Sequence, residues 1–185
     1  GPILAALGAD VTIFDISEKQ LLQDIKVNEE FDLKIKTVKG DMRDLSFFAD
    51  DYFDIIFNPC SVSFIDNVQQ VWRECFRVLK PEGVLMTGLT NPVVFHFFVE
   101  EGYFKLKYVQ PYSDIHSLSE MELDIIINKK ETLEFGHSFT DLIGGQMEAG
   151  FYLTDIYEDD WNGTKLIDKY LPSFFAIRSV RRNSF

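Results

Sequence analysis

Apolar runs and amphipathic segments alternate along the first half of the chain, and this pattern predicts strands and helices in turn. Four runs are short, mostly apolar and rich in β-branched or aromatic residues, which is typical of strands. They span residues 11–14, 33–39, 53–57 and 84–88. We expect one helix to begin at Ser17, which has capping-box spacing to Gln20, and another over residues 66–79, where apolar residues recur at helical spacing. This alternation predicts a parallel sheet with right-handed crossovers.

The pattern changes after residue 90. We expect a short Phe-rich helix, a strand with one solvent-exposed face, two further helices and two final strands. These cover residues 92–101, 104–108, 119–130, 138–149, 151–157 and 173–180. The complete set predicts an α/β fold: a Rossmann-like, doubly wound and mostly parallel sheet with an antiparallel terminal hairpin strand and a small helical cap insertion.

Composition and charge narrow the range of functions. The chain has 185 residues, of which 46% are hydrophobic, and this is enough for one domain with a sizeable core. The net charge of -12 argues against nucleic acid and anionic membranes as partners. The sequence shows no apolar run of transmembrane length and no signal-peptide pattern. Cys60 and Cys75 form no Cys-x-x-Cys pair, so we expect no metal site and a cytoplasmic location.

Asp15 is the first candidate for a functional role. It follows the predicted strand over residues 11–14 and precedes a helix. A carboxylate at the tip of a parallel strand can accept hydrogen bonds from both ribose hydroxyls, as in nucleotide-binding α/β folds. The alternative is a loop aspartate or a charge that the helix dipole favours.

Four pieces, in order and spacing, resemble the class I S-adenosylmethionine-dependent methyltransferases of the small-molecule type. They are Asp15, Gly40-Asp41-Met42, the strand that runs into Asn58-Pro59, and the turn Arg77-Val78-Leu79-Lys80-Pro81-Glu82-Gly83. In that turn Glu82 replaces the first glycine of the family's R-x-L-K-P-G-G pattern. The resemblance covers about residues 1–90. It implies a single methyltransferase domain over 1–185, with a cofactor-binding half (1–90), a cap (91–150) and terminal strands (151–185).

The resemblance implies S-adenosyl-L-methionine as the cofactor and assigns its adenosine contacts. Asp15 would accept from the ribose hydroxyls, and Ile16 would pack on the adenine. Asp41, which follows Gly40, would accept from the adenine amino group. The Met42 amide would face a ring nitrogen, with its side chain on the ring.

The same resemblance places the strand tip at Asn58 and Pro59 beside the reactive methyl group. It also implies a strand and a glycine-rich turn that precede this sequence, with Gly1 as the last residue of that turn. We therefore expect an N-terminally incomplete domain. The tip departs from the Asn-Pro-Pro-aromatic pattern of enzymes that methylate amino groups of bases, because Cys60 and Ser61 follow Pro59.

The acceptor is therefore expected to be a small molecule. Methyl transfer needs a general base only if the acceptor must lose a proton, and no acid–base pair stands out. His137 and Tyr112 are candidates for a catalytic or acceptor contact; the alternatives are a surface or capping histidine and an aromatic residue of the cap core. The oligomeric state is left open, a homodimer included.

Two other functions remain open at this point. A nicotinamide-dependent oxidoreductase would use Asp15 equally well, and Tyr103 and Lys107 have the Tyr-x-x-x-Lys spacing of short-chain dehydrogenases. That pair should lie on a helix, whereas the pattern here predicts a strand. A methyltransferase-like domain that binds or regulates without catalysis is the other alternative.

Overall fold

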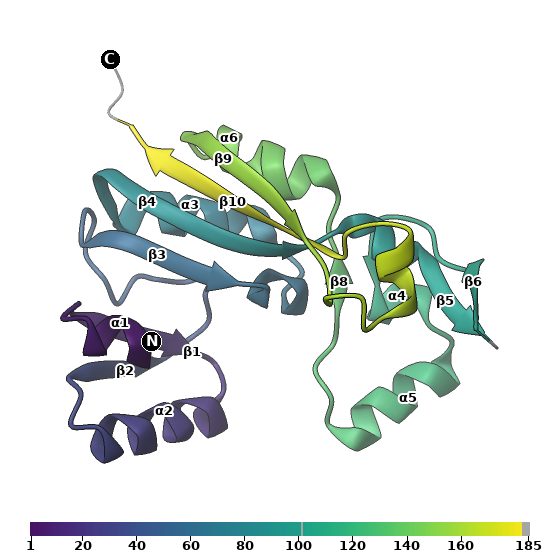
Figure 1. The fold of residues 1–185 in the computed structure, drawn as a ribbon, viewed down its shortest axis with the longest axis horizontal. Helices are drawn as coiled ribbons and strands as arrows, with labels where there is room; N and C mark the ends of the chain where they lie inside the picture. Colours follow the sequence, from purple (N-terminus) through teal and green to yellow (C-terminus); the bar gives the residue numbers. More distant parts are fainter. Residues whose placement is uncertain (101, 183–185) are drawn as a thin grey trace. The chain divides into compact units, whose positions relative to one another are not determined.

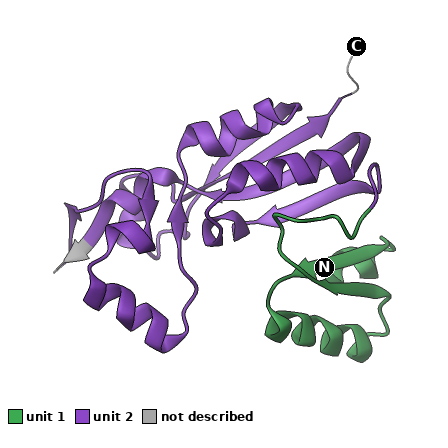
Figure 2. Cartoon of the chain, turned by 180° about the vertical axis from the view of Figure 1, so that it is seen from behind, with its two compact units in different colours: residues 1–48 green, residues 49–185 purple. Residues whose placement is uncertain are grey.

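The computed structural model describes residues 1–100 and 102–182 (Figure 1). The chain forms two compact units, Gly1–Phe48 and Ala49–Phe185, shown in different colours in Figure 2. The boundary between them lies within the predicted cofactor-binding half. The division at residues 90 and 150 stays a prediction.

Unit 1 is a small α/β body. Its elements are α1 (Pro2–Ala6), β1 (Val11–Asp15), α2 (Glu18–Glu30) and β2 (Ile35–Lys39). The two strands are parallel and in register from Val11↔Ile35 to Asp15↔Lys39. Asp15 and the residues that follow β2 therefore lie at the same edge. As the capping pattern predicts, the Gln20 amide donates to the Ser17 hydroxyl at the start of α2 (3.4 Å).

Unit 2 is built on a four-stranded sheet with the order β3-β4-β10-β9. The strands are β3 (Phe53–Pro59), β4 (Leu79–Thr90), β9 (Phe151–Asp159) and β10 (Phe174–Arg181). The pair β3–β4 is parallel, and β10 is antiparallel to both β4 and β9. The mixed α/β class and the antiparallel terminal hairpin are thus confirmed.

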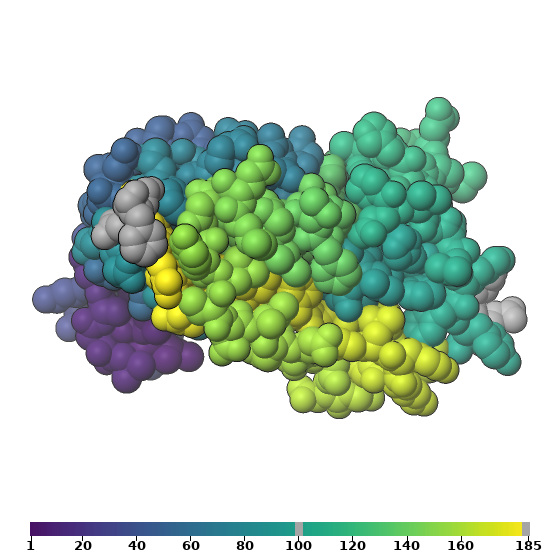
Figure 3. Space-filling model, turned by 90° about the horizontal axis from the view of Figure 1, so that it is seen from above, coloured from purple at the N-terminus to yellow at the C-terminus, as the bar shows by residue number. Residues whose placement is uncertain are grey.

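The helix α3 (Val68–Val78) and the segment of η3 (Thr140–Gly144) and α6 (Gly145–Glu148) pack on each other beside this sheet (Figure 1). The apolar face of α3 is buried as its periodicity predicts. A Cβ on Gly145 would lie 2.8 Å from Trp72 Cδ1, so glycine allows the two helical segments to approach closely. In Figure 3 the residues around 140–160 cover much of the visible face of unit 2.

The predicted turn over residues 80–83 lies within β4, and the predicted start of this strand is wrong. α3 ends at Val78, and β4 begins directly at Leu79, five residues earlier than expected. Glu82 has a positive φ of 63°, and a Cβ on Gly83 would lie 2.7 Å from the carbonyl oxygen of Lys80. Gly83 is therefore needed for this turn to close.

The rest of unit 2 contains helices and two small sheets. Its elements are η1 (Ser61–Phe64), η2 (Pro92–His96), β5 (Phe97–Glu100), β6 (Tyr103–Leu106), β7 (Tyr112–Ser113), α4 (Asp114–Ser117), α5 (Glu120–Lys129), β8 (Phe135–Gly136) and η4 (Leu166–Lys169). The capping box of Ser119 and Glu122 is present at the start of α5.

The helix predicted over residues 92–101 is wrong in its second half. Only η2 is helical, and Phe97–Glu100 is a strand paired antiparallel with β6. Gly102, with φ of 82°, lies in the connection between the two strands. Cross-strand pairing of aromatic residues here overrides the local helical pattern. Residue 101 lies outside the described residues.

One buried hydrogen bond ties α6 to β10. The Ser179 hydroxyl donates to Gln146 Oε1 at 2.7 Å, and both side chains are fully buried. We predict that Ser179→Ala lowers the free energy of unfolding by about 1–3 kcal/mol, because the amide oxygen loses its buried donor. Urea unfolding measures this.

Thr132→Ala is the matched control, since Thr132 is exposed. Its unfolding free energy should change by less than about 0.5 kcal/mol. Equal unfolding free energies for the two variants would contradict a stabilising role of the Ser179–Gln146 hydrogen bond.

Candidate active site

Asp15 ends β1 with one carboxylate oxygen engaged. The Ser17 amide donates to Oδ1 at 2.7 Å, which fixes the side chain at the start of α2. No other described residue bonds to this carboxylate. The next side chain, Ile16, is apolar and 66% exposed. This edge of unit 1 therefore presents an acceptor oxygen beside an apolar surface, which fits a ribose and an adenine ring.

The loop after β2 lies against the end of β1. The Gly40 amide donates to the Asp15 carbonyl at 3.1 Å, so Asp41 and Met42 follow closely on the Asp15 edge. A Cβ on Gly40 would lie 2.2 Å from Phe14 Cζ, and Phe14 is packed edge-on against Phe48. Glycine at this position therefore lets the loop approach the strand.

Asp41 is already part of an ion pair. Its Oδ2 lies 2.6 Å from Arg43 Nη2, and the Arg43 amide donates to Oδ1 at 2.9 Å. The hydrogen bond from the Arg43 side chain outweighs burial and lowers the pKa of Asp41. Arg43 Nε also donates to both oxygens, at 3.0 and 3.1 Å, so three Arg43 donors engage this carboxylate. A carboxylate offers about four acceptor positions, which leaves Asp41 capacity for one more donor. Asp41 can thus accept a hydrogen bond from an adenine amino group only while it also accepts those from Arg43.

Gly1 and Met42 are placed in the same unit. Gly1 precedes α1 directly as its N-cap, and a Cβ there would lie 2.5 Å from Ile13 Cδ1 on β1. Met42 is half-buried. Gly1 and Met42 therefore belong to the same unit as Asp15, Ile16 and Asp41, which lie around one edge of β1 and β2.

The tip of β3 forms the other candidate region, in unit 2. Asn58 is 8% exposed, and the Ser61 hydroxyl donates to its Oδ1 at 2.6 Å. Pro59 is exposed. Cys60 has a positive φ of 56°, and its amide donates to the Gly88 carbonyl at 2.7 Å. This left-handed residue turns the chain sharply from the strand into η1.

His137 lies beside that tip. Its Nε2 is 3.1 Å from the carbonyl oxygen of Val62 in η1. Because a carbonyl only accepts, Nε2 carries the hydrogen, and Nδ1 of the neutral ring retains its lone pair. The structure thus brings His137 into contact with the segment that follows Asn58 and Pro59, although the two are far apart in the sequence.

Tyr112 supports the His137 segment from β7. It pairs with Gly136, and a Cβ on Gly136 would lie 2.9 Å from Tyr112 Cβ and 2.7 Å from Phe95 Cδ2. The Tyr112 hydroxyl donates to Asp114 Oδ1 at 2.5 Å, and Asp114 is 4% exposed. Burial, followed by this hydrogen bond, raises the pKa of Tyr112. The Tyr112 hydroxyl therefore stays protonated.

Sequence reasoning missed three of these partners: the Val62 carbonyl, Asp114 and Ser61 as a donor to Asn58. A backbone carbonyl leaves no trace in a residue pattern, and the contact of His137 with Val62 spans 75 positions. A Ser three residues after Asn58 was a usable signal, because short polar side chains commonly bond within a turn.

The pair proposed for an oxidoreductase is not arranged on a helix. Tyr103 begins β6, and Lys107 forms an ion pair with Glu122 at 2.7 Å. Among the described residues no group of three or more His, Cys, Asp or Glu side chains is placed to hold a metal ion. In the same residues no helix is long and apolar enough to cross a membrane.

Known proteins with similar sequences are methyltransferases. The profile of the methyltransferase domain matches residues 2–87. An uncharacterized methyltransferase of Bacillus subtilis, YbaJ, is 48% identical over 184 residues, which are 98% of this chain and 71% of that protein.

Solved structures share the fold at low sequence identity. An S-adenosylmethionine dependent methyltransferase from Mesorhizobium loti superposes with a TM-score of 0.70 at 16% identity, over 93% of this chain and 80% of that chain. A putative S-adenosylmethionine dependent methyltransferase from Listeria monocytogenes superposes with a TM-score of 0.64 at 15% identity. The match covers 94% of this chain and 81% of that chain.

We predict that Arg43→Gln raises the pKa of Asp41 toward the ordinary value of about 3.9. A carboxylate with a lowered pKa stabilises the fold above its unfolded-state pKa and loses that contribution as pH falls through the folded-state value. In the variant, the contribution of Asp41 to the free energy of unfolding should therefore fall less on acidification. NMR titration of the carboxyl carbon measures the pKa. The control Lys39→Gln removes an exposed ion pair with Glu18 and should leave the pKa of Asp41 unchanged.

We also predict opposite neutral tautomers for two histidines. His137 donates through Nε2 to Val62, whereas His96 Nδ1 lies 3.0 Å from the Tyr108 carbonyl and must donate through that nitrogen. Long-range ¹H–¹⁵N correlation spectra at neutral to mildly alkaline pH distinguish the two forms. Finding the same tautomer at both residues would contradict one of these placements.

Proposed function

We propose that this chain, which belongs to the family of S-adenosylmethionine-dependent methyltransferases, transfers a methyl group to a small-molecule acceptor. The observation that carries the proposal is the hydrogen bond from the Gly40 amide to the Asp15 carbonyl, which brings Asp15 and the loop that begins Gly40-Asp41 to one edge of unit 1. The net charge of -12 disfavours nucleic acid as the acceptor. Two free cysteines are consistent with a reducing, cytoplasmic compartment.

The residues of unit 1 would hold S-adenosylmethionine. Asp15 would accept from the ribose hydroxyls through the oxygen that Ser17 leaves open. Ile16 would cover one face of the adenine, and Asp41 would take its amino group in addition to Arg43. Met42 and Gly40 would complete the adenine contact, with Gly1 nearer the methionine end.

When bound, S-adenosylmethionine supplies an activated methyl group on a positively charged sulfur. The protein then has to orient the acceptor and exclude water. We assign acceptor orientation to the tip of β3, where Asn58 is fixed by Ser61 and followed by Pro59. His137 would take the acceptor's proton at Nδ1, because Nε2 is committed to Val62. Tyr112 would hold the His137 segment in place.

Calorimetric titration with S-adenosylhomocysteine tests the cofactor assignment. We predict that Asp15→Asn weakens binding by roughly 10- to 100-fold, the scale of charge-assisted hydrogen bonds of about 1.5–3 kcal/mol. The asparagine oxygen can still accept from Ser17, so the local fold is kept. Glu29→Gln removes an exposed charge from the same unit and should leave the affinity unchanged.

NADH is titrated in parallel. Binding of NADH without binding of S-adenosylhomocysteine would overturn the proposal in favour of an oxidoreductase. Binding of neither would favour a domain that acts without catalysis.

A further inference from the structure

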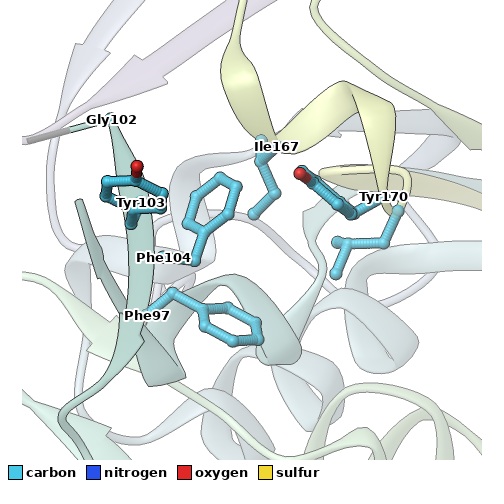
Figure 4. A pocket seen from close by; sticks show the side chains of 7 residues that line it. Phe97, Gly102, Tyr103, Phe104, Ile167 and Tyr170 are labelled. Carbon is cyan, nitrogen blue, oxygen red and sulfur yellow. The ribbon is translucent and has the colours of Figure 1, made fainter. Parts of the chain in front are cut away.

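An apolar cavity lies in unit 2, between the β5–β6 hairpin and the segment around η4. Its volume is about 360 Å³, within the roughly 300–1,000 Å³ typical of small-molecule sites. The lining residues are Phe97, Gly102, Tyr103, Phe104, Ile167, Tyr170 and Leu171, and none of them is charged. Figure 4 shows the side chains of the hairpin and of the η4 segment around the same space.

Aromatic rings form most of the wall and meet edge to face. The Phe104 ring centroid lies 5.7 Å from that of Phe97 and 5.6 Å from that of Tyr170, with interplanar angles of 62° and 89°. Such edge-to-face arrangements are the geometry that a further aromatic ring also favours. Tyr103 and Tyr170 are 75% and 71% exposed, whereas Phe97 and Phe104 are partly buried.

The cavity is attached to the end of the sheet that carries the tip of β3. Asn91, directly after β4, donates through its amide to the Ser173 carbonyl (2.8 Å) and through its side chain to the Pro172 carbonyl (2.9 Å). Its side-chain oxygen accepts from the Val93 amide at 3.0 Å. Asn91 therefore fixes both chain segments that enclose the cavity to the carboxyl end of β4, and β4 pairs with β3 up to Pro59.

From this geometry we propose that the cavity binds the methyl acceptor and that the acceptor carries an uncharged aromatic ring system. The assignment as an acceptor pocket rests on the proposed methyl transfer, whereas the ligand class rests on the cavity itself. The lining offers no counter-charge, and the strongly negative chain disfavours an anionic ligand. The aromatic walls favour a flat ring over an aliphatic group of equal size.

The test uses two probes with the same carbon skeleton, 2-naphthol and its saturated form decahydro-2-naphthol. Ligand-observed NMR titrations into the full chain give both dissociation constants. We expect 2-naphthol to bind at least fivefold more tightly than the saturated probe. Equal affinities, or no binding of 2-naphthol up to millimolar concentration, would overturn the proposal.

Two cavity variants locate the probe. Tyr170→Ala removes an exposed aromatic ring from the wall and should weaken 2-naphthol binding at least fivefold. Ile167→Trp fills the space and should abolish binding. Tyr157→Ala, an exposed tyrosine on β9 outside the cavity, is the matched control and should bind as the unaltered chain does. Circular dichroism verifies the fold, and affinities within twofold in both folded cavity variants would overturn the assignment.

Titration of S-adenosylhomocysteine into the same samples separates this inference from the proposed function. If the unaltered chain binds S-adenosylhomocysteine but not 2-naphthol, the aromatic pocket is wrong and the methyl-transfer proposal stands. If it binds 2-naphthol in the cavity but not S-adenosylhomocysteine, the role as an acceptor pocket is overturned together with the proposed function.

Discussion

The parallel pairing of β3 with β4 is the constraint on which the candidate acceptor region depends. The register from Ile55↔Val84 to Pro59↔Gly88 brings the ends of the two strands to the same edge. At that edge the Cys60 amide bonds to Gly88, and the Ser63 hydroxyl donates to that of Thr90 at 3.2 Å. The strand tip that carries Asn58 and the segment that encloses the aromatic cavity are therefore held by neighbouring strands of one sheet.

Much of the fold follows from local patterns because the relevant signals are short-range. The apolar stripe of α3 and the capping box of α5 each depend on residues three or four positions apart. The segment over residues 92–101 fails for the opposite reason: its second half is decided by pairing with β6, which a single-segment pattern does not contain. The start of β4 is misjudged because Pro81 and Glu82 look like a loop while the strand continues on both sides.

The candidate site shows the same division. Asp15 and Gly40 could be placed from the sequence because strand ends of a parallel sheet share an edge. The competition between Arg43 and any ligand for Asp41 could not, since it depends on how a long side chain folds back on its neighbour. His137 was only one of three histidines in the sequence, and its contact with Val62 distinguishes it from His116, which is exposed on α4.

The anchoring of His137 through Nε2 leaves Nδ1 as the ring atom at which a proton can be added. Uptake of a proton at Nδ1 turns the ring into an imidazolium without removing the hydrogen that Nε2 shares with the Val62 carbonyl. The orientation of the ring is therefore the same in the neutral and the protonated form. A histidine held instead through an accepting nitrogen would lose its anchor when that nitrogen took up a proton.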